Sequence, residues 1–261
     1  MKEITCKSIL SKSRLEDYSI NPYRGCTHCC KYCYAPYILR EKREWGTFIE
    51  PKVNAPEVLE KDLKRNKPGN IFISSVTDPY NSLEEKYKLT RRILEKLIGT
   101  KFSASIQTKS KLVLRDIDLL KKIKCEVGMT ITTFDEKTRK VFEPNASSSM
   151  ERLETLKKLK DEGIRTYIFF GPMLPFISDK NLEETVNKFA TAKPDRIFAD
   201  KMNIKRPVHW TKLKSVLEKN YPDLVDRWQE ILFTDNDYYD VLKQKLIELF
   251  RKHGLNYSIC Y

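Results

Sequence analysis

The chain has 261 residues, seven of them cysteines, and its 49 Lys and Arg residues against 36 Asp and Glu give a net charge of +13. No stretch is apolar enough to span a bilayer, and the first residues lack the hydrophobic region of a signal peptide. An odd number of cysteines, three of them clustered, suits a reducing compartment better than a disulfide framework. These features exclude a membrane protein and a disulfide-stapled domain, so we expect a cytoplasmic protein, monomeric and without a membrane partner.

The excess of basic residues favours a polyanionic partner, because cationic side chains release counterions from a phosphate backbone. The same abundance of Lys and Glu is also typical of heat-adapted proteins, in which most charges lie on solvated faces. Charge therefore leaves nucleic-acid binding open.

Short β-type runs alternate along the chain with segments of helical periodicity. Runs rich in β-branched or aromatic residues lie at 18–20, 70–74, 102–106, 126–131, 165–170 and 195–199. Helical periodicity covers 56–65, 89–98, 117–123, 149–162 and 181–190. Such alternation predicts parallel strands with right-handed crossovers. We therefore predict an α/β fold of about six β/α units, too few for a closed eight-stranded barrel.

The pattern becomes helical after Trp210, over 210–219, 224–231 and 237–253, and ends in the short apolar run 255–261. We interpret residues 211–261 as a C-terminal helical extension packed on a first domain, residues 1–210.

Three cysteines on one tight loop carry the strongest chemical signal. Cys26, Cys30 and Cys33 have the spacing C-x3-C-x2-C. A 4Fe-4S cube has four iron corners, and structural clusters fill each corner with a cysteine thiolate. Three cysteines leave one iron open to coordinate and activate a small molecule. The loop follows the first predicted strand, at the barrel end where the chemistry of such folds takes place.

Zinc is the alternative occupant of this loop, since it binds four N or S ligands tetrahedrally. Zinc sites usually bring a second pair of ligands, whereas the other candidates here are isolated: His28, His209, His253, Cys6, Cys125 and Cys260. Cys29 adjoins Cys30 and cannot easily point at the same iron corner, so we interpret it as a bystander.

The cysteine motif resembles that of the radical S-adenosylmethionine (radical SAM) superfamily. The resemblance implies a partial (β/α)6 TIM-like barrel, a 4Fe-4S cluster on Cys26, Cys30 and Cys33, and S-adenosylmethionine (SAM) as second cofactor. In that superfamily the methionine amino and carboxylate groups chelate the open iron, and reductive cleavage gives a 5'-deoxyadenosyl radical. Tyr32 matches an aromatic position near the adenine, with simple packing beside the loop as the alternative. Flavodoxin or ferredoxin is the implied electron donor.

Signatures at the strand ends resemble one branch of that superfamily, the spore photoproduct lyase-like proteins, often labelled DNA repair photolyases. The likeness extends from about Ser19 to Arg206. It implies that Ser75, Thr77 and Asp78 bind the methionine amino group. The alternative is an ordinary turn, because Asp before Pro is a good turn initiator.

The same resemblance gives roles to two further strand ends. Lys109 matches a lysine that could pair with the SAM carboxylate, a task that suits a compact ammonium. Thr132 and Thr133 lie where ribose hydroxyls are usually hydrogen-bonded. A Thr at a strand end also needs no ligand, so the structural alternative stays open.

The chain departs from spore photoproduct lyase proper in one respect. That enzyme has a further cysteine, some tens of residues after the cluster, that returns a hydrogen atom to the product radical. Between Cys33 and Cys125 this chain has none. Tyr80 and Cys125 are the candidates for that role, although Cys125 begins a predicted strand, where a core position is the plain alternative.

We therefore predict a radical SAM enzyme that abstracts hydrogen from a substrate, with a base or sugar in DNA favoured. A peptide, an RNA or a small metabolite is the alternative substrate. A different class is a non-catalytic, metal-containing module that binds nucleic acid through its basic surface. Salt-sensitive binding to oligonucleotides separates the DNA substrate from the smaller ones.

Overall fold

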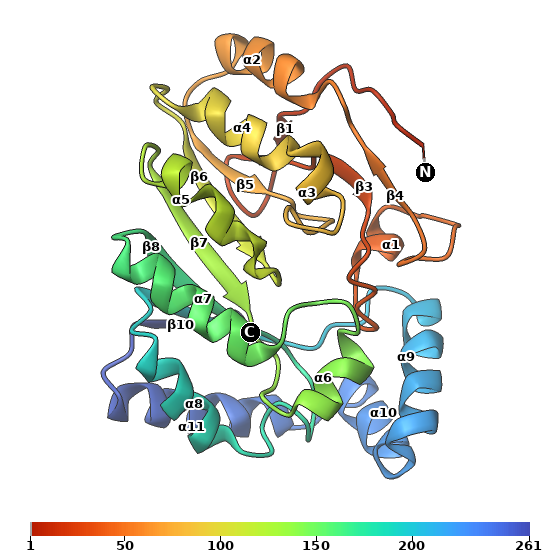
Figure 1. Cartoon of the computed structure of the whole chain (residues 1–261). Helices are drawn as coiled ribbons and strands as arrows, with labels where there is room; N and C mark the ends of the chain where they lie inside the picture. The colour runs from red at the N-terminus through yellow and green to blue at the C-terminus, as the bar shows by residue number, and fades with distance from the viewer. Residues whose placement is uncertain (1) are drawn as a thin grey trace.

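The computed structural model describes residues 2–261 and has a curved central sheet of eight strands (Figure 1). In spatial order the strands are β1 (Ser11–Lys12), β2 (Tyr18–Ile20), β5 (Asn70–Ile73), β6 (Ser103–Thr108), β7 (Cys125–Thr130), β8 (Arg165–Met173), β9 (Arg196–Lys201) and β10 (Tyr257–Ile259). Neighbours from β2 to β10 pair in parallel, and β1 pairs antiparallel with β2. Because β1 and β10 end this order, the barrel is open, and the predicted partial barrel is confirmed.

The predicted strands form because each carries apolar residues that the core buries completely. Ile71 and Ile73 of β5, Val127 and Met129 of β7, and Ile168 of β8 all have 0% of their surface exposed. Strands buried on both faces are typical of parallel sheets with helices on the outside. The sheet therefore forms the wall of one continuous core.

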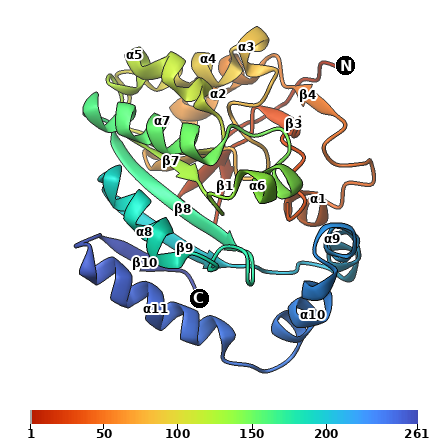
Figure 2. The ribbon, with the colours of Figure 1, turned by 60° about the horizontal axis from the view of Figure 1, so that its bottom comes forward.

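Helices cover the outer face of the sheet, as Figures 1 and 2 show. They are α2 (Ala55–Arg65), α4 (Leu89–Leu97), α5 (Ile117–Leu120), α7 (Ser149–Asp161), α8 (Leu182–Thr191) and α11 (Tyr238–Lys252). A capping box fixes the start of α7, because Ser148 and Glu151 each bond the other's backbone N–H. Among residues 2–261, no helix is both long and apolar enough to cross a bilayer.

The remaining helical segments lie near the ends of the strands or in the C-terminal part. They are α1 (Ala35–Ile38), α3 (Glu84–Tyr87), α6 (Glu136–Phe142), α9 (Pro207–Asn220), α10 (Val225–Phe233) and the 3-10 turns η1 (Lys111–Asp116) and η2 (Pro222–Leu224). Trp228 of α10 is fully buried and donates to the backbone oxygen of Pro175 at 2.9 Å. The C-terminal helices therefore pack on the main core.

The apolar end of the chain forms a strand that the sequence reading did not predict. β10 pairs in parallel with β9, so the sheet has seven parallel strands where about six were expected. The pairing joins residues far apart in the chain, such as Tyr257 and Ile197, so the local pattern gives no sign of it. The C-terminal part therefore adds both helices and a strand to the barrel.

A second small sheet, also not predicted, positions the cysteine loop. β3 (Tyr23–Gly25) pairs antiparallel with β4 (Ile49–Pro51). Gly25 has a φ of +84°, and a Cβ there would lie 2.4 Å from the backbone oxygen of Phe48. Only glycine tolerates both constraints, so this residue turns the chain directly into Cys26.

Candidate active site

The three predicted ligands lie together in a dehydrated loop. Cys26 is buried, and Cys30 and Cys33 are half-buried. Burial raises the pKa of each thiol to about 12. Repulsion between neighbouring sulfurs adds to the rise, from Cys33 at Cys26 and from Cys30 at Cys33. Thiolates in such a place require a strong positive partner, and a metal centre supplies one. The donor set therefore fits the iron–sulfur cluster that the spacing predicts.

Cys29 has a different environment. Its backbone φ is +56°, and its Sγ lies 3.5 Å from Lys31 Nζ and 4.0 Å from the backbone oxygen of Trp45. A Cβ on Gly46 would lie 2.4 Å from the same sulfur, so the thiol packs against the segment around Gly46. Within residues 2–261, no three His, Cys, Asp or Glu side chains converge on a point that one metal ion could occupy.

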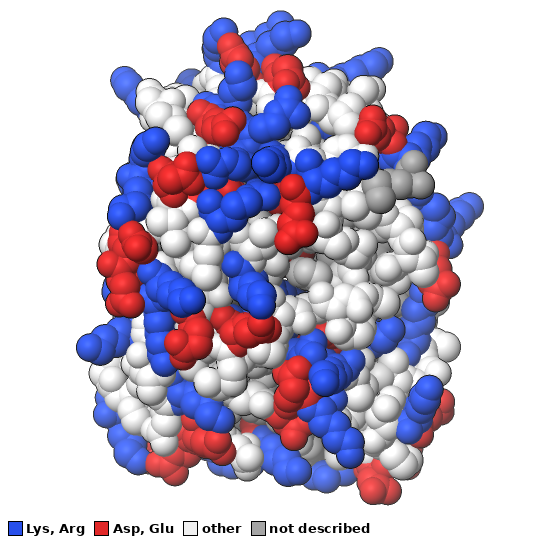
Figure 3. All heavy atoms as spheres, viewed as in Figure 1, with Lys and Arg blue, Asp and Glu red and all other residues white. Residues whose placement is uncertain are grey.

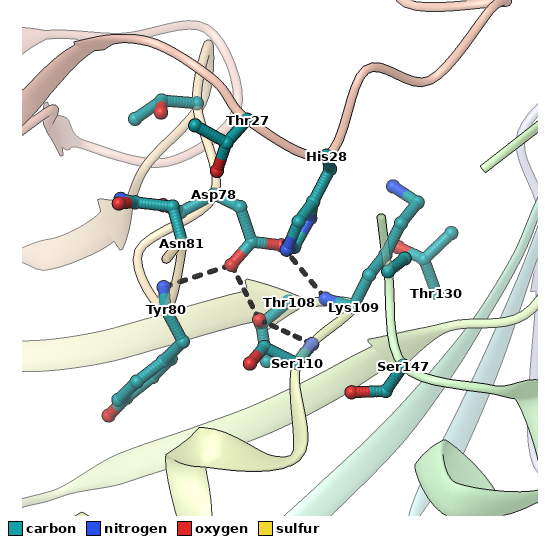
Figure 4. Close-up of polar contacts among 12 residues, drawn as sticks. Thr27, His28, Asp78, Tyr80, Asn81, Thr108, Lys109, Ser110, Thr130 and Ser147 are labelled. Carbon is teal, nitrogen blue, oxygen red and sulfur yellow. Dashed lines mark hydrogen bonds and ion pairs between the residues drawn. The ribbon is translucent and has the colours of Figure 1, made fainter. Parts of the chain in front are cut away.

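A buried contact between His28 and Asp78 fixes the middle of the cysteine loop (Figure 4). Nδ1 of His28 lies 3.2 Å from Oδ2 of Asp78, and both side chains are less than a tenth exposed. The same carboxylate accepts bonds from Thr108 Oγ1 at 2.6 Å and from the backbone N–H groups of Tyr80 and Lys109 at 2.9 Å. Burial would raise the pKa of Asp78, but His28 and these donors lower it below the usual range. Asp78 is thus an anion that joins the loop to the ends of β5 and β6.

Asp78 was predicted to bind the methionine amino group. Each of its two carboxylate oxygens has two partners within the protein. The side chain therefore positions the cysteine loop, and its contact with SAM stays a prediction.

A second buried carboxylate, Glu143, lies beneath Tyr32. Tyr32 Oη donates to Glu143 Oε1, and Thr132 Oγ1 donates to the same atom at 3.2 Å. Arg152 Nη2 lies 2.5 Å from Glu143 Oε2, and both of these side chains have 0% exposure. Burial would raise the pKa of Glu143, but Arg152 and Lys109 outweigh burial and lower it. The site therefore contains a buried anion that the sequence reading did not identify as functional.

Thr132 and Thr133, the residues predicted to contact the ribose, bond within the protein. Thr132 is fully buried, and its hydroxyl donates to Glu143. Thr133 is 6% exposed, and its Oγ1 accepts the backbone N–H of Asp135 at 3.1 Å. Both hydroxyls support the local structure, and their contact with a ribose stays a prediction.

Lys109 places its ammonium over the ring of Tyr32. Its ammonium lies 5.7 Å from the centre of the Tyr32 ring, and it makes no hydrogen bond or ion pair within residues 2–261. Burial would lower its pKa, but Cys30 and Glu143 outweigh burial and raise it. A charged, half-buried ammonium beside the cysteine loop thus has a free donor set for an anionic ligand group.

The Lys109→Ala variant is expected to bind SAM about 10 to 100 times more weakly, because a hydrogen bond to a charged group contributes about 1.5–3 kcal/mol. Cluster loading should change little, since Lys109 is not a ligand to iron. Equilibrium binding of SAM to the reconstituted protein, beside its iron content, measures both. Lys111→Ala is the matched control, because Lys111 pairs with Glu151 on the surface. Equal SAM affinity in wild type and Lys109→Ala would show that Lys109 does not contact SAM.

Ser75 and Thr77, the other residues predicted near the methionine amino group, lie in the loop after β5. Thr77 Oγ1 donates to the backbone oxygen of Gly25 at 2.6 Å, and Ser75 Oγ accepts from Asn21 at 3.1 Å. The backbone oxygen of Ser75 accepts from Tyr34 Oη. Both residues are half-buried beside the cysteine loop, so their contact with SAM stays a prediction.

The two candidates for a hydrogen-atom donor lie away from the cysteines. Tyr80 is 1% exposed, its ring points away from the Asp78 carboxylate in Figure 4, and Glu84, Asp116 and Arg115 surround it. Cys125 begins β7, at the strand end opposite the cysteine loop, with Sγ 3.4 Å from the backbone oxygen of Leu120. The structure therefore favours neither residue for that role.

His209 connects the C-terminal part to the cysteine loop, a contact that the sequence gave no sign of. Its Nε2 lies 3.2 Å from the backbone oxygen of Tyr32, and its ring stacks on Tyr37 with centres 4.4 Å apart. Burial lowers the pKa of His209 to about 4, so the ring is neutral at pH 7. An isolated histidine at position 209 carries no local signal, because the residue it supports lies 177 positions earlier.

Taken together, the structure is an open parallel barrel with a loop of three neighbouring cysteines at the ends of its strands. The sequence matches the Radical SAM superfamily over residues 20–189, more than half of the chain. The chain therefore belongs to this superfamily of enzymes, whose cofactors are a 4Fe-4S cluster and SAM.

Three similar proteins extend this result. An uncharacterised protein of Methanocaldococcus jannaschii is 38% identical over 212 residues, which cover 79% of this chain and 77% of that one. Spore photoproduct lyase complexed with dinucleoside spore photoproduct has a TM-score of 0.71 at 17% identity, over 99% of this chain and 80% of that chain. SuiB of Streptococcus suis, bound to the precursor peptide SuiA, has a TM-score of 0.61 at 17% identity, over 92% of this chain and 48% of that chain. The two structural likenesses show the fold.

Proposed function

We propose that this chain is a radical SAM enzyme that abstracts a hydrogen atom from a base or sugar in DNA. The observation that carries the proposal is the unpartnered Lys109 ammonium beside three dehydrated cysteines. A 4Fe-4S cluster held by Cys26, Cys30 and Cys33 would supply the one-electron reduction of SAM from which hydrogen abstraction starts. Lys109, at the end of β6, holds the SAM carboxylate by charge.

The other residues of the site hold or shield the cofactors. Cys26, Cys30 and Cys33 bind the cluster, and Ser75 and Thr77 lie where the methionine amino group binds. Glu143 holds the hydroxyl of Tyr32, and the ring of Tyr32 would pack against the adenine. His28 and Asp78 keep the loop in place from within the core.

The test is anaerobic reconstitution with iron and sulfide, followed by incubation with SAM and dithionite. We expect 5'-deoxyadenosine to form, and we expect its formation to depend on the cysteines. A loaded cluster that produces none would favour the non-catalytic binding module.

The DNA substrate is supported by the net charge of +13 and by the fold shared with spore photoproduct lyase. On the face in Figure 3, however, basic and acidic side chains are interspersed. Ion pairs such as Arg92–Glu57 and Lys96–Glu60 join α4 to α2. These pairs reduce the positive charge available to phosphate, so a peptide substrate, as SuiB binds, is the second candidate.

Affinity for a single-stranded DNA oligonucleotide is expected to fall as salt rises, with a slope of log K against log [salt] of about −2 to −4, as expected for a few phosphate contacts. Fluorescence anisotropy between low and moderate salt measures the slope. A short neutral peptide is the control and should show none. A flat response of the oligonucleotide would contradict the DNA substrate and favour a peptide or a small metabolite.

We further propose a monomeric, cytoplasmic protein in which residues 211–261 extend the barrel of residues 1–210, with their helices packed on it and β10 added to its sheet. Reduced flavodoxin or ferredoxin supplies the electron.

A further inference from the structure

Two segments far apart in the sequence meet beside the cysteine loop. Figures 1 and 2 both show α1 next to the start of α9. Arg206 Nε donates to the backbone oxygen of Tyr37 at 3.0 Å, and the Tyr37 ring stacks on His209. The end of α1 and the start of α9 therefore form one continuous piece of surface.

This surface carries exposed apolar side chains. Ile38 is 54% exposed, Leu39 44% and Val208 50%. Single exposed apolar residues are common, but three on two joined segments form the apolar centre that protein interfaces usually have.

Basic residues flank these three residues in the sequence. Arg40, Lys42, Lys205 and Arg206 are exposed, and none of them forms an ion pair within residues 2–261. The acid nearest in sequence, Glu41, has a side chain only 6% exposed and is bonded to Arg24 and Arg43. On α2 and α4, by contrast, Lys64, Arg92 and Lys96 are paired with Glu. The positive charge of this surface is thus available to a partner.

The surface is also close to the cluster ligands. Cys33 is two residues before the start of α1. Leu39 follows this helix of one turn, and its N–H donates to the backbone oxygen of Ala35. His209, on the α9 side, contacts the backbone oxygen of Tyr32. Only the short helix α1 separates Leu39 from Cys33 along the chain, so an electron that enters at this surface has a short path to the cysteine loop.

We propose that Ile38, Leu39 and Val208, with the rim of Arg40, Lys42, Lys205 and Arg206, form the docking face for an acidic protein that carries a low-potential one-electron centre. This proposal rests on the proposed function and names the partner that reduces its cluster. The carrier is oxidised by one electron for each SAM whose S–C5' bond breaks.

The features of the face match such a partner. Electron-transfer encounters are small, so three apolar residues and a charged rim are enough. Opposite charge speeds the encounter, which a redox carrier needs more than tight binding. A phosphate backbone would require mainly cationic and hydrogen-bonding contacts, and would leave the apolar centre unused.

The test compares two reductants in the cluster-loaded protein. With reduced flavodoxin as donor, the variant Arg40→Glu/Lys205→Glu is expected to form 5'-deoxyadenosine with a kcat/KM at least about tenfold lower, because like charges now face each other. With dithionite, its rate should equal that of wild type. Lys67→Glu/Lys101→Glu has the same net charge and changes exposed residues that precede β5 and β6, at the opposite end of the barrel. This control should keep both rates.

Direct binding of flavodoxin, measured by calorimetry without SAM, tests the face independently of turnover. Ile38→Ser should weaken that binding without changing its salt dependence, because it removes apolar area alone. Equal flavodoxin binding by wild type and both variants would overturn the docking face. Loss of oligonucleotide binding with flavodoxin binding unchanged would overturn it too and assign the surface to nucleic acid. No product with dithionite in wild type would refute the proposed function instead.

Discussion

Replacing Cys30 by alanine is expected to abolish both the iron–sulfur colour and the formation of 5'-deoxyadenosine. Loss of residues that only support metal ligands costs about 10 to 100-fold in metal affinity, and loss of a ligand should cost more. The Cys30 thiol is close enough to Cys26, Lys109 and Glu143 for their charges to change its pKa. We expect no other thiol to take its place as a ligand. Iron and sulfide content per chain, together with product formation, measures the effect.

Cys29→Ala is the matched control, because it removes the adjacent thiol from the same loop. Its sulfur faces Lys31 and the backbone of Trp45, so colour and iron content should stay close to those of wild type. A colourless Cys29 variant, or a Cys30 variant with full iron content, would contradict the assignment of the three ligands. Thermal unfolding of both variants before reconstitution separates cluster loss from misfolding.

Glu143→Gln is expected to destabilise the protein by about 3–5 kcal/mol, because it leaves Arg152 as a buried charge without its partner. Glutamine keeps the size and can still accept the bonds of Tyr32 and Thr132, so the loss of charge is the main change. The melting temperature should fall by roughly 10 °C, since each kcal/mol shifts it by about 2–4 °C in a chain of this size.

Glu162→Gln provides the comparison for that variant. Glu162 pairs with Lys121 at 2.7 Å, but both side chains are about half exposed. Exposed pairs contribute about 1 kcal/mol or less, so the same substitution should hardly change the melting temperature. The double variant Glu143→Gln/Arg152→Met should recover part of the lost stability, because it removes the unpaired charge. Equal melting temperatures for the two single variants would show that the Glu143–Arg152 pair is not a buried anchor.

Local sequence patterns determined the six predicted strands and the cysteine loop. Each strand is a run of neighbouring β-branched or aromatic residues, and the loop is a spacing within eight residues, so both can be recognised without knowing the partners in space. The same holds for the start of α7, where Ser148 and Glu151 form a capping box within one turn.

Tertiary structure alone decided which polar groups are available for chemistry. Tyr32 and Glu143 are 111 positions apart, and Asp78 and Thr108 are 30 apart, so their bonds depend on how the strands pack. Long-range packing gave the Asp78 carboxylate and the Thr132 hydroxyl hydrogen-bond partners within the protein, and it added β10 to the sheet. It left the Lys109 ammonium over the Tyr32 ring, without a hydrogen bond or ion pair. A sequence states which residue types are present, whereas burial and the count of hydrogen-bond partners decide which of them remain free to bind.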